Sequence, residues 1–400
     1  MKELHFDFRD IFRAGRYGFA GKKITVHFLG LAISYLIYEV LVYLSLLIAG
    51  GNAAREFWNK YALLPVCPYV DYNFETITVG AMWIGTFILF IIFFLTSTMV
   101  SKITIQQLRG DSFFSMRDSA GFVKKNWKAV FGTFIGLIFI FILFALTPIA
   151  VGLLGKIPVV GRVIVMLASI LMPLAFVLGL LMMYLLVVLS VSTFFVPAVV
   201  AAADADTFES VYQHFSIIWN QPWRIIVYEA LLFVMKIICV PIWSIFCAIG
   251  FALATLPLRY LLPTDMQIIM GQANQWLGGW IAKLAELPYV DKFKIFQVFD
   301  TVADPANGPI MLKITAVFMT LSLLFIAGLV IAYLLSMASA GNTLIYTILR
   351  RRADGENLLE VKEEDEEISL SDATKEEPQA DLPKDQSDST EENSDKDANE

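Results

Sequence analysis

The chain has 400 residues, of which 57% are hydrophobic and 17% charged, and its mean hydropathy is +0.66. A soluble domain is usually about half apolar and about a quarter charged, so this composition excludes an ordinary soluble domain and favours a membrane protein. The net charge of −7 is the sum of two parts of opposite sign. Residues 353–400 carry 19 Asp/Glu against 4 Lys, whereas residues 1–352 carry a net charge of +8.

Residues 1–24 are predicted to form an amphipathic helix on the inner membrane surface. Phe8, Ile11, Phe12 and Phe19 fall on one face at helical spacing, and arginines fall on a flank of that face. Such a helix lies at the headgroup boundary with its basic side near anionic lipids. Alternatively, the segment is an anchor before the first span whose basic residues only follow the positive-inside bias, without specific lipid recognition.

Six apolar stretches are long enough to cross the hydrocarbon layer, which takes about 20 helical residues. They cover approximately residues 25–50, 78–100, 130–154, 163–192, 225–257 and 311–340. The fourth and fifth are longer than needed, and kinks at Pro173, Pro197 and Pro241 absorb the excess. A re-entrant hairpin around Pro173 is the alternative. We therefore predict an all-α polytopic membrane helix bundle over residues 25–349, with about six transmembrane helices and interfacial amphipathic helices.

Basic residues in the flanks of the spans predict the orientation. Sixteen Lys and Arg fall on the side that holds both termini, against eight on the other side, half of them in one long loop. With an even number of spans, both termini are expected in the cytoplasm. The first apolar run is too long for a cleaved signal peptide and reads as a retained span.

Between the fourth and fifth spans, residues 206–219 predict a second amphipathic helix. Asp206 and Glu209 form a capping-box-like start, and Pro222 ends the helix. Its apolar positions recur at helical spacing and must cover the bundle, the membrane interface or a partner; they are Phe208, Val211, Tyr212, Phe215, Ile218 and Trp219. At the start of the third span, Gly132 and Gly136 form a GxxxG pattern that permits close helix packing within the chain.

The outer loop 258–310 and the tail 350–400 have opposite compositions. In the loop, Trp276, Leu277 and Trp280 lie on one helical face, which suits an aromatic belt at the outer interface or a lid that gathers substrate. The tail is rich in Asp, Glu and Ser with few large apolar residues, so we expect it to be disordered.

Three ionisable residues inside the spans are candidates for binding. Glu39 lies midway along the first span, and Lys236 lies deep in the fifth with Glu229 two turns before it. At 1.5 Å per residue, Glu39 and Lys236 lie at depths of roughly 21 Å and 17 Å, so they can reach similar heights. A charge at the centre of a span is costly, so each is expected to face the bundle or a cavity. A proton- or ion-coupled site and a buried pair that only fixes helix packing both fit this pattern.

No catalytic motif or ligand set is visible. The chain has no GxxxxGK[ST], HExxH or GxSxG motif, its three histidines are scattered, and its three cysteines form no CxxC pair. We therefore expect no catalytic residue, metal, cofactor or nucleic-acid partner. The first hypothesis is a non-enzymatic membrane protein that acts by interaction or membrane organisation, with the lipid bilayer as partner and a protein partner on helix 206–219 or the tail. A small-solute transporter and a lipid-modifying membrane enzyme are the alternatives.

Several local features resemble those of a known group of proteins. They are Phe195-Val196-Pro197, the amphipathic helix that follows, Pro222-Trp223-Arg224, Tyr346, Leu349-Arg350 and Asp354-Gly355. In these features, over residues 195–228 and 341–360, the chain is similar to uncharacterised bacterial membrane proteins and to the membrane domain fused to some glycerophosphodiester phosphodiesterases. The phosphodiesterase domain has no counterpart here. The resemblance implies a multi-pass protein of a bacterial cytoplasmic membrane.

Overall fold

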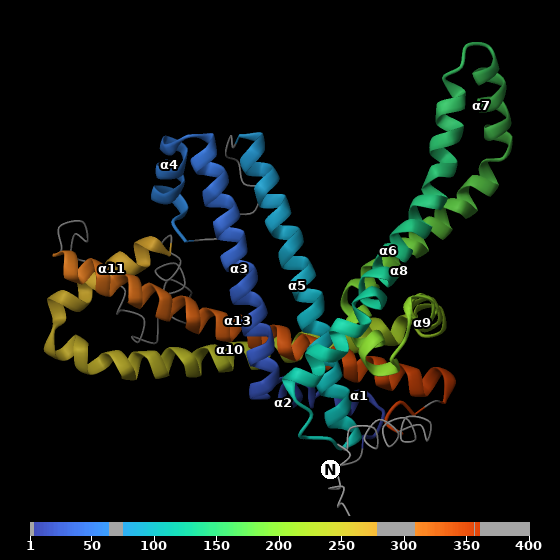
Figure 1. The fold of residues 1–400 in the computed structure, drawn as a ribbon. Helices are drawn as coiled ribbons and strands as arrows, with labels where there is room; N and C mark the ends of the chain where they lie inside the picture. Colours follow the sequence, from blue (N-terminus) through green and yellow to red (C-terminus); the bar gives the residue numbers. More distant parts are fainter. Residues whose placement is uncertain (1–3, 64–74, 278–308, 356, 361–400) are drawn as a thin grey trace, which may run out of the picture. The chain divides into compact units, whose positions relative to one another are not determined.

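The computed structural model describes residues 4–63, 75–277, 309–355 and 357–360. Within these ranges every regular element is an α-helix. The chain divides into two units, Met1–Leu359 and Glu360–Glu400, and the helices drawn in Figure 1 lie in the first. Residues 361–400, which hold most of the predicted acidic tail, lie outside the described residues.

Six of the described helices are long and apolar enough to cross a membrane, which confirms the predicted all-α polytopic bundle. They are α3 (Gly21–Ala49), α5 (Thr76–Arg109), α6 (Met116–Gly155), α8 (Met172–Ala203), α10 (Pro222–Leu261) and α13 (Ile310–Asp354). Each overlaps one predicted span. The fourth predicted stretch differs most, because the helix breaks at Leu171 and leaves α7 (Val160–Ile170) as a separate element before α8. Pro173 explains the break, since proline fits the first turn of a helix and interrupts its interior.

The long helices continue beyond the apolar stretches that predict them. Forty residues of α6 span about 60 Å at 1.5 Å per residue, about twice the hydrocarbon thickness of a bilayer. The start of α6 is polar and opens with a capping box between Ser115 and Asp118. At the other end of the chain, α13 continues to Asp354, so the first residues of the predicted tail are helical.

The largest buried cluster lies where α3 and α10 begin and where α5, α8 and α13 end, and α6 adds Leu137 from its middle; we call this the basic end. The last part of α13 is its centre, because every residue from Ser339 to Leu349 is buried. A helix that is covered on all sides belongs in the middle of a core. It is surrounded by α2, α3, α5, α8 and α10. Helices α10 and α13 cross α3 and α5 at this core (Figure 1).

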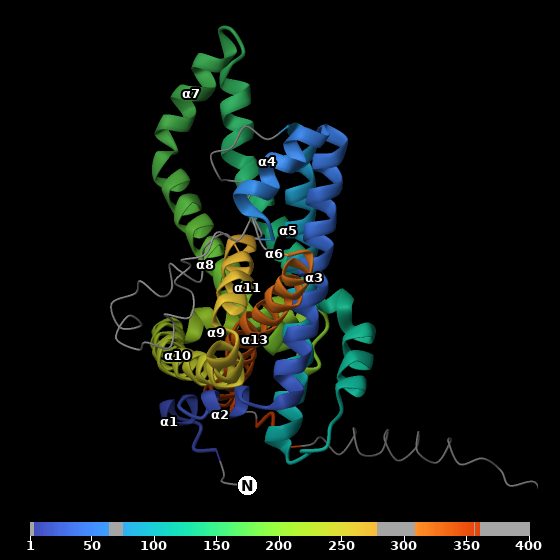
Figure 2. The same cartoon turned by 90° about the vertical axis from the view of Figure 1, so that its left-hand side faces the viewer.

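Two short helices stand where the sequence predicts one amphipathic helix over residues 1–24. They are α1 (Phe8–Ile11) and α2 (Ala14–Gly18), and both contact α10 and α13 (Figure 2). Ile11 is fully buried in the core, and the Ser336 hydroxyl donates to the Gly18 carbonyl at 2.7 Å. Phe8 and Phe12 are exposed. The segment is therefore joined to the core on one side, and its place on the inner leaflet stays a prediction.

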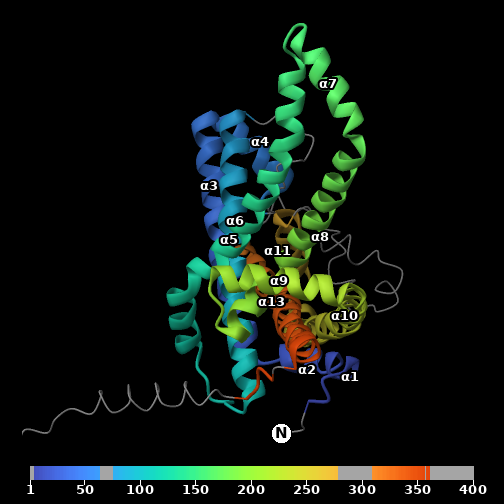
Figure 3. The same cartoon turned by 90° about the vertical axis from the view of Figure 1, so that its right-hand side faces the viewer.

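At the opposite end, shorter helices cover the spans. Helix α4 (Gly51–Tyr61) packs on α3, and α11 (Pro263–Trp276) packs on α10 and α13. Helix α6 pairs with α8, and α7 contacts both, as the three helices do in Figures 1 and 3. The α11 helix ends at Trp276, and residues 278–308, which include the rest of the predicted aromatic face, lie outside the described residues.

Candidate functional site

A buried lysine marks the junction of α2, α3 and α5 at the basic end. The Lys23 side chain is fully buried, and its ammonium donates to the Tyr17 carbonyl at 3.0 Å and to Gln107 Oε1 at 2.9 Å. Both acceptors are neutral, and the ammonium also lies 5.7 Å from the Tyr17 ring centroid. These contacts hold the first turn of α3 against the end of α5.

A histidine one turn further along α3 reaches α13. His27 Nε2 and the Ser339 hydroxyl lie 3.1 Å apart in a buried hydrogen bond. The Asn342 amide, also on α13, donates to the Phe194 carbonyl of α8 at 3.0 Å. Within the described part of the chain, His27 Nδ1 and Asn342 Oδ1 are buried without a hydrogen bond. These hydrogen bonds therefore fix α13 in the core. Two polar atoms of the same side chains make no hydrogen bond to the described residues.

Glu39 lies in the second half of α3, and its side chain is buried, with 8% exposure. Its Oε1 makes no hydrogen bond to any described residue, although an ionised carboxylate inside a span is costly without a partner. Tyr35 and Tyr43 stand one turn before and after it, and their hydroxyls donate to the carbonyls of Leu63 (2.6 Å) and Ala62 respectively. The two tyrosines thus hold the end of the α4 segment beside the carboxyl group and leave that group unpaired.

Glu229 and Lys236 lie on the face of α10 that packs against α13. Leu232, between them on the same face, contacts Gly341, where an added Cβ atom would fall 2.4 Å from the leucine side chain. Both charged residues are half-buried and close enough to interact electrostatically. Among the described residues, no ion pair or hydrogen bond joins Glu39 to Lys236. A functional role for the three residues stays a prediction.

Helix α9 (Thr207–Asn220) confirms the predicted helix between the fourth and fifth spans. The Asp206 carboxylate accepts from the Glu209 amide at 2.8 Å, and the helix ends two residues before Pro222. The GxxxG pattern of α6 seats this helix, because Cβ atoms built on Gly132 and Gly136 would fall 2.7 Å and 3.6 Å from Thr207 and Val211. The pattern therefore serves packing within the chain, as the sequence predicts.

The side of α9 that packs on the bundle differs from its predicted apolar face. Its buried residues are Ser210, Gln213, His214, Ile217 and Ile218. The aromatic residues Phe208, Tyr212 and Trp219 are 86%, 67% and 73% exposed. Of the six apolar positions only Ile218 is buried, with Val211 and Phe215 partly buried against the core. We call Phe208, Tyr212 and Trp219 the aromatic edge of α9.

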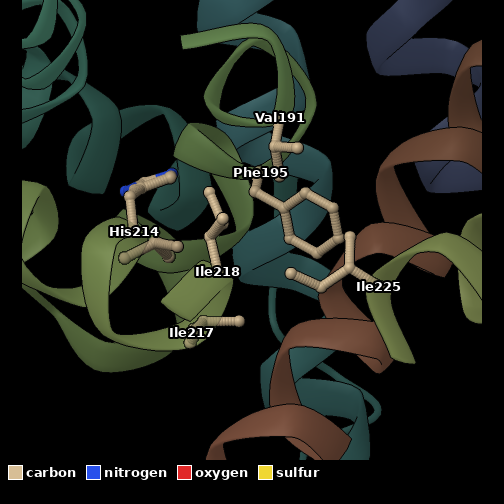
Figure 4. A pocket seen from close by; sticks show the side chains of 7 residues that line it. Val191, Phe195, His214, Ile217, Ile218 and Ile225 are labelled. Carbon is tan, nitrogen blue, oxygen red and sulfur yellow. The ribbon is translucent and has the colours of Figure 1, made fainter. Parts of the chain in front are cut away.

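His214 lies on the buried side of α9, beside a small apolar hollow between α8, α9 and α10 (Figure 4). Its Nδ1–H donates to the Ser210 carbonyl at 2.6 Å, and Nε2 has no hydrogen-bond partner in the described structure. Burial lowers the pKa of His214 to about 4, against the opposing effect of the Ser210 bond. The cavity volume is about 10 Å³, near the minimum for one water molecule, so this hollow is no substrate pocket.

The sequence prediction missed the buried groups of the basic end. Lys23 is one of the sixteen basic residues in the flanks of the spans and His27 is one of the three scattered histidines, and the structure buries both side chains completely. One signal was available: small polar residues recur along the end of α13, at Ser336, Ser339, Asn342, Thr343 and Thr347, which is typical of helix contacts in membranes. In the described part of the chain, no group of three or more His, Cys, Asp or Glu side chains is arranged to hold a metal ion.

The fold and these sites define a multi-pass α-helical membrane protein. Comparison with protein-family models, with curated proteins and with solved structures finds no match.

Proposed function

We propose that this chain is a non-enzymatic, multi-pass protein of a bacterial cytoplasmic membrane, with both termini in the cytoplasm, that acts by interaction or membrane organisation. The bacterial location rests on the resemblance of residues 195–228 and 341–360 to bacterial membrane proteins, and the orientation rests on the excess of basic residues at one side. Phe195, Tyr346 and Leu349, which carry part of that resemblance, are all buried in the core of the basic end.

The aromatic edge of α9 is the observation that carries the proposal. Three large aromatic side chains project from a helix whose opposite side is fixed to α6 and α8. Large exposed apolar surfaces mark contacts with proteins or membranes. Because α9 is already packed against α6 and α8, its backbone does not have to be ordered when a partner binds. A preformed surface of this kind favours binding.

Two assays test the proposal with the full chain. In the first, the purified protein in proteoliposomes is expected to show no solute or proton flux above protein-free vesicles and no release of phospholipid headgroups. In the second, benzoyl-phenylalanine replaces Tyr212 in living cells, and illumination is expected to join this position to one recurring occupant, lipid or protein. The same label at Leu253, an exposed position on α10, is the control for general contact. Flux above protein-free vesicles, or an unlabelled Tyr212 position, would overturn the proposal.

A transporter is the second candidate because of Glu39. A buried carboxyl group with an unbonded oxygen, held between two tyrosines in the middle of a span, suits a proton or cation carrier. Glu39→Gln keeps the shape and removes the ionisable group. If wild-type vesicles show flux, loss of that flux in a folded Glu39→Gln protein supports this function, and full retention rejects Glu39 as its carrier.

A further inference from the structure

The position of α9 along the spans sets its depth in the membrane. Thr207 and Val211 rest on Gly132 and Gly136 of α6, where the apolar stretch of that helix begins. On α8, the Tyr184 hydroxyl donates to the Phe215 carbonyl at 3.3 Å, which places α9 beside apolar residues of α8. The first turns of α9 therefore lie level with the start of the apolar stretch of α6, and Phe215 lies beside the apolar part of α8. The polar start of α6 precedes this level.

The exposed surface of α9 has two edges of different chemistry. The aromatic edge occupies one side of the exposed arc, and Glu209 and Asn220 occupy the other. Buried residues fill the remainder of the helix. A helix that lies in the plane of a membrane interface has this division, with aromatic rings toward the acyl chains and polar groups toward water.

Basic residues lie near both ends of the same helix. Lys124, Lys125 and Lys128 are exposed on α6 just before the glycine seat, and the Thr207 hydroxyl donates to the Lys128 carbonyl at 3.4 Å. On the other side, the Arg224 guanidinium lies 5.5 Å from the exposed Trp223 ring. The acidic groups of this region are fewer: Asp204 pairs with Lys102 at 2.6 Å, Asp206 caps α9, and Glu209 is on its polar edge. The three lysines and Arg224 each come just before an apolar stretch, where a helix that crosses a bilayer meets the phospholipid headgroups.

We propose that α9 is a lipid-binding interfacial helix: its aromatic edge inserts among the acyl chains of one leaflet, and Lys124, Lys125, Lys128 and Arg224 bind anionic phospholipid headgroups. The proposal deepens the proposed function by naming its partner. An anionic lipid matches both halves of the surface, because its chains cover the aromatic rings and its phosphate meets the lysines. A protein partner is the competing occupant, and the experiment below separates the two.

The test is photocrosslinking of the purified full chain in nanodiscs that contain equal amounts of phosphatidylglycerol and phosphatidylcholine. Benzoyl-phenylalanine at position 212 is expected to give lipid adducts, with several-fold more phosphatidylglycerol than phosphatidylcholine. The same label at Asn220, on the polar edge, is the matched control and is expected to give few adducts. Lipid adducts of equal amount at both positions would overturn the insertion of the aromatic edge.

The headgroup contact has its own variant. Replacing Lys124, Lys125 and Lys128 by Gln is expected to lower the preference for phosphatidylglycerol roughly fivefold or more while leaving total adducts unchanged. Lys156, just after the end of α6, and Arg162, near the start of α7, are exposed and serve as the control. Replacing these two residues by Gln leaves the preference for phosphatidylglycerol intact. An unchanged preference in the triple variant rejects the headgroup assignment.

The outcomes also separate this inference from the proposed function. If position 212 labels only protein in cells and no lipid in nanodiscs, the lipid assignment fails and an interaction function stands. If position 212 labels neither, both fail.

Discussion

Thr207 lies directly against Gly132, so that a Cβ atom built on the glycine would fall 2.7 Å from the threonine hydroxyl. The contact joins α9 to the third span at a point where no side chain fits. It fixes the height and rotation of α9, and hence the direction in which Phe208, Tyr212 and Trp219 project.

Filling this contact is expected to destabilise the protein. Gly132→Val forces α9 away from α6, and overpacking of this kind costs about 1–3 kcal/mol. Gly152, on the same helix, has open space around it, so Gly152→Val is the matched control with a stability near wild type. Thermal unfolding in detergent measures both. Equal melting temperatures for the two variants would contradict the packing described here.

The buried His214 predicts an acid-sensitive stability. Its folded pKa is about 4, below the value of about 6.5 for a free histidine. Between these values the unfolded chain binds the extra proton, so stability is fully present above pH 6.5 and falls by about 3 kcal/mol as the pH drops toward 4. Unfolding measured across this window is expected to show a shallower fall in His214→Asn than in wild type. His5→Asn, which changes an exposed histidine, is the control.

The three intramembrane charges are expected to behave as one coupled pair and one separate residue. Glu229→Gln and Lys236→Met interact in a double-mutant cycle, with a coupling energy of about 0.5 kcal/mol or more, because the two charges act on each other. Glu39→Gln and Lys236→Met are additive, because no bond joins them. Reversible unfolding in mixed micelles gives all the values. Coupling between Glu39 and Lys236 would restore the idea of a shared midplane site.

The hydroxyl of Tyr35 is expected to stabilise the contact between α3 and the segment that follows α4. Tyr35→Phe removes the bond to the Leu63 carbonyl and leaves that carbonyl without its donor, at a cost of about 1 kcal/mol. Tyr260→Phe removes a hydroxyl that is exposed and serves as the control. Thermal unfolding distinguishes the two, and equal stability would show that the Tyr35 bond contributes nothing.

The sequence correctly predicts the features that depend on neighbouring residues. The cap at Asp206 and the end of α9 before Pro222 depend on neighbours in sequence, and both are confirmed. The six spans follow from length and apolarity alone. The break at Leu171 is also local, yet the apolar run on both sides hides it.

Sequence patterns do not predict contacts between residues that are far apart in the chain. Periodicity finds the aromatic side of α9, but in a membrane protein an apolar side faces lipid as readily as core, so the pattern does not reveal that Ser210 and His214 are the buried ones. Depth counting gives the heights of Glu39 and Lys236 but not the direction in which each faces. One of the two acceptors of the buried Lys23 ammonium is Gln107, 84 positions later in the chain, and no local pattern predicts that contact.

The central place of α13 has a consequence for biogenesis. The stretch from Ser339 to Leu349 is the core of the basic end, and it leaves the ribosome after the other five long helices. Those five must therefore enter the bilayer with His27 facing the unfilled place of Ser339, and packing of the core waits for α13. Insertion and tight packing are thus separate stages, and nascent chains that stop short of Ala332 would be left as open substrates for membrane proteases.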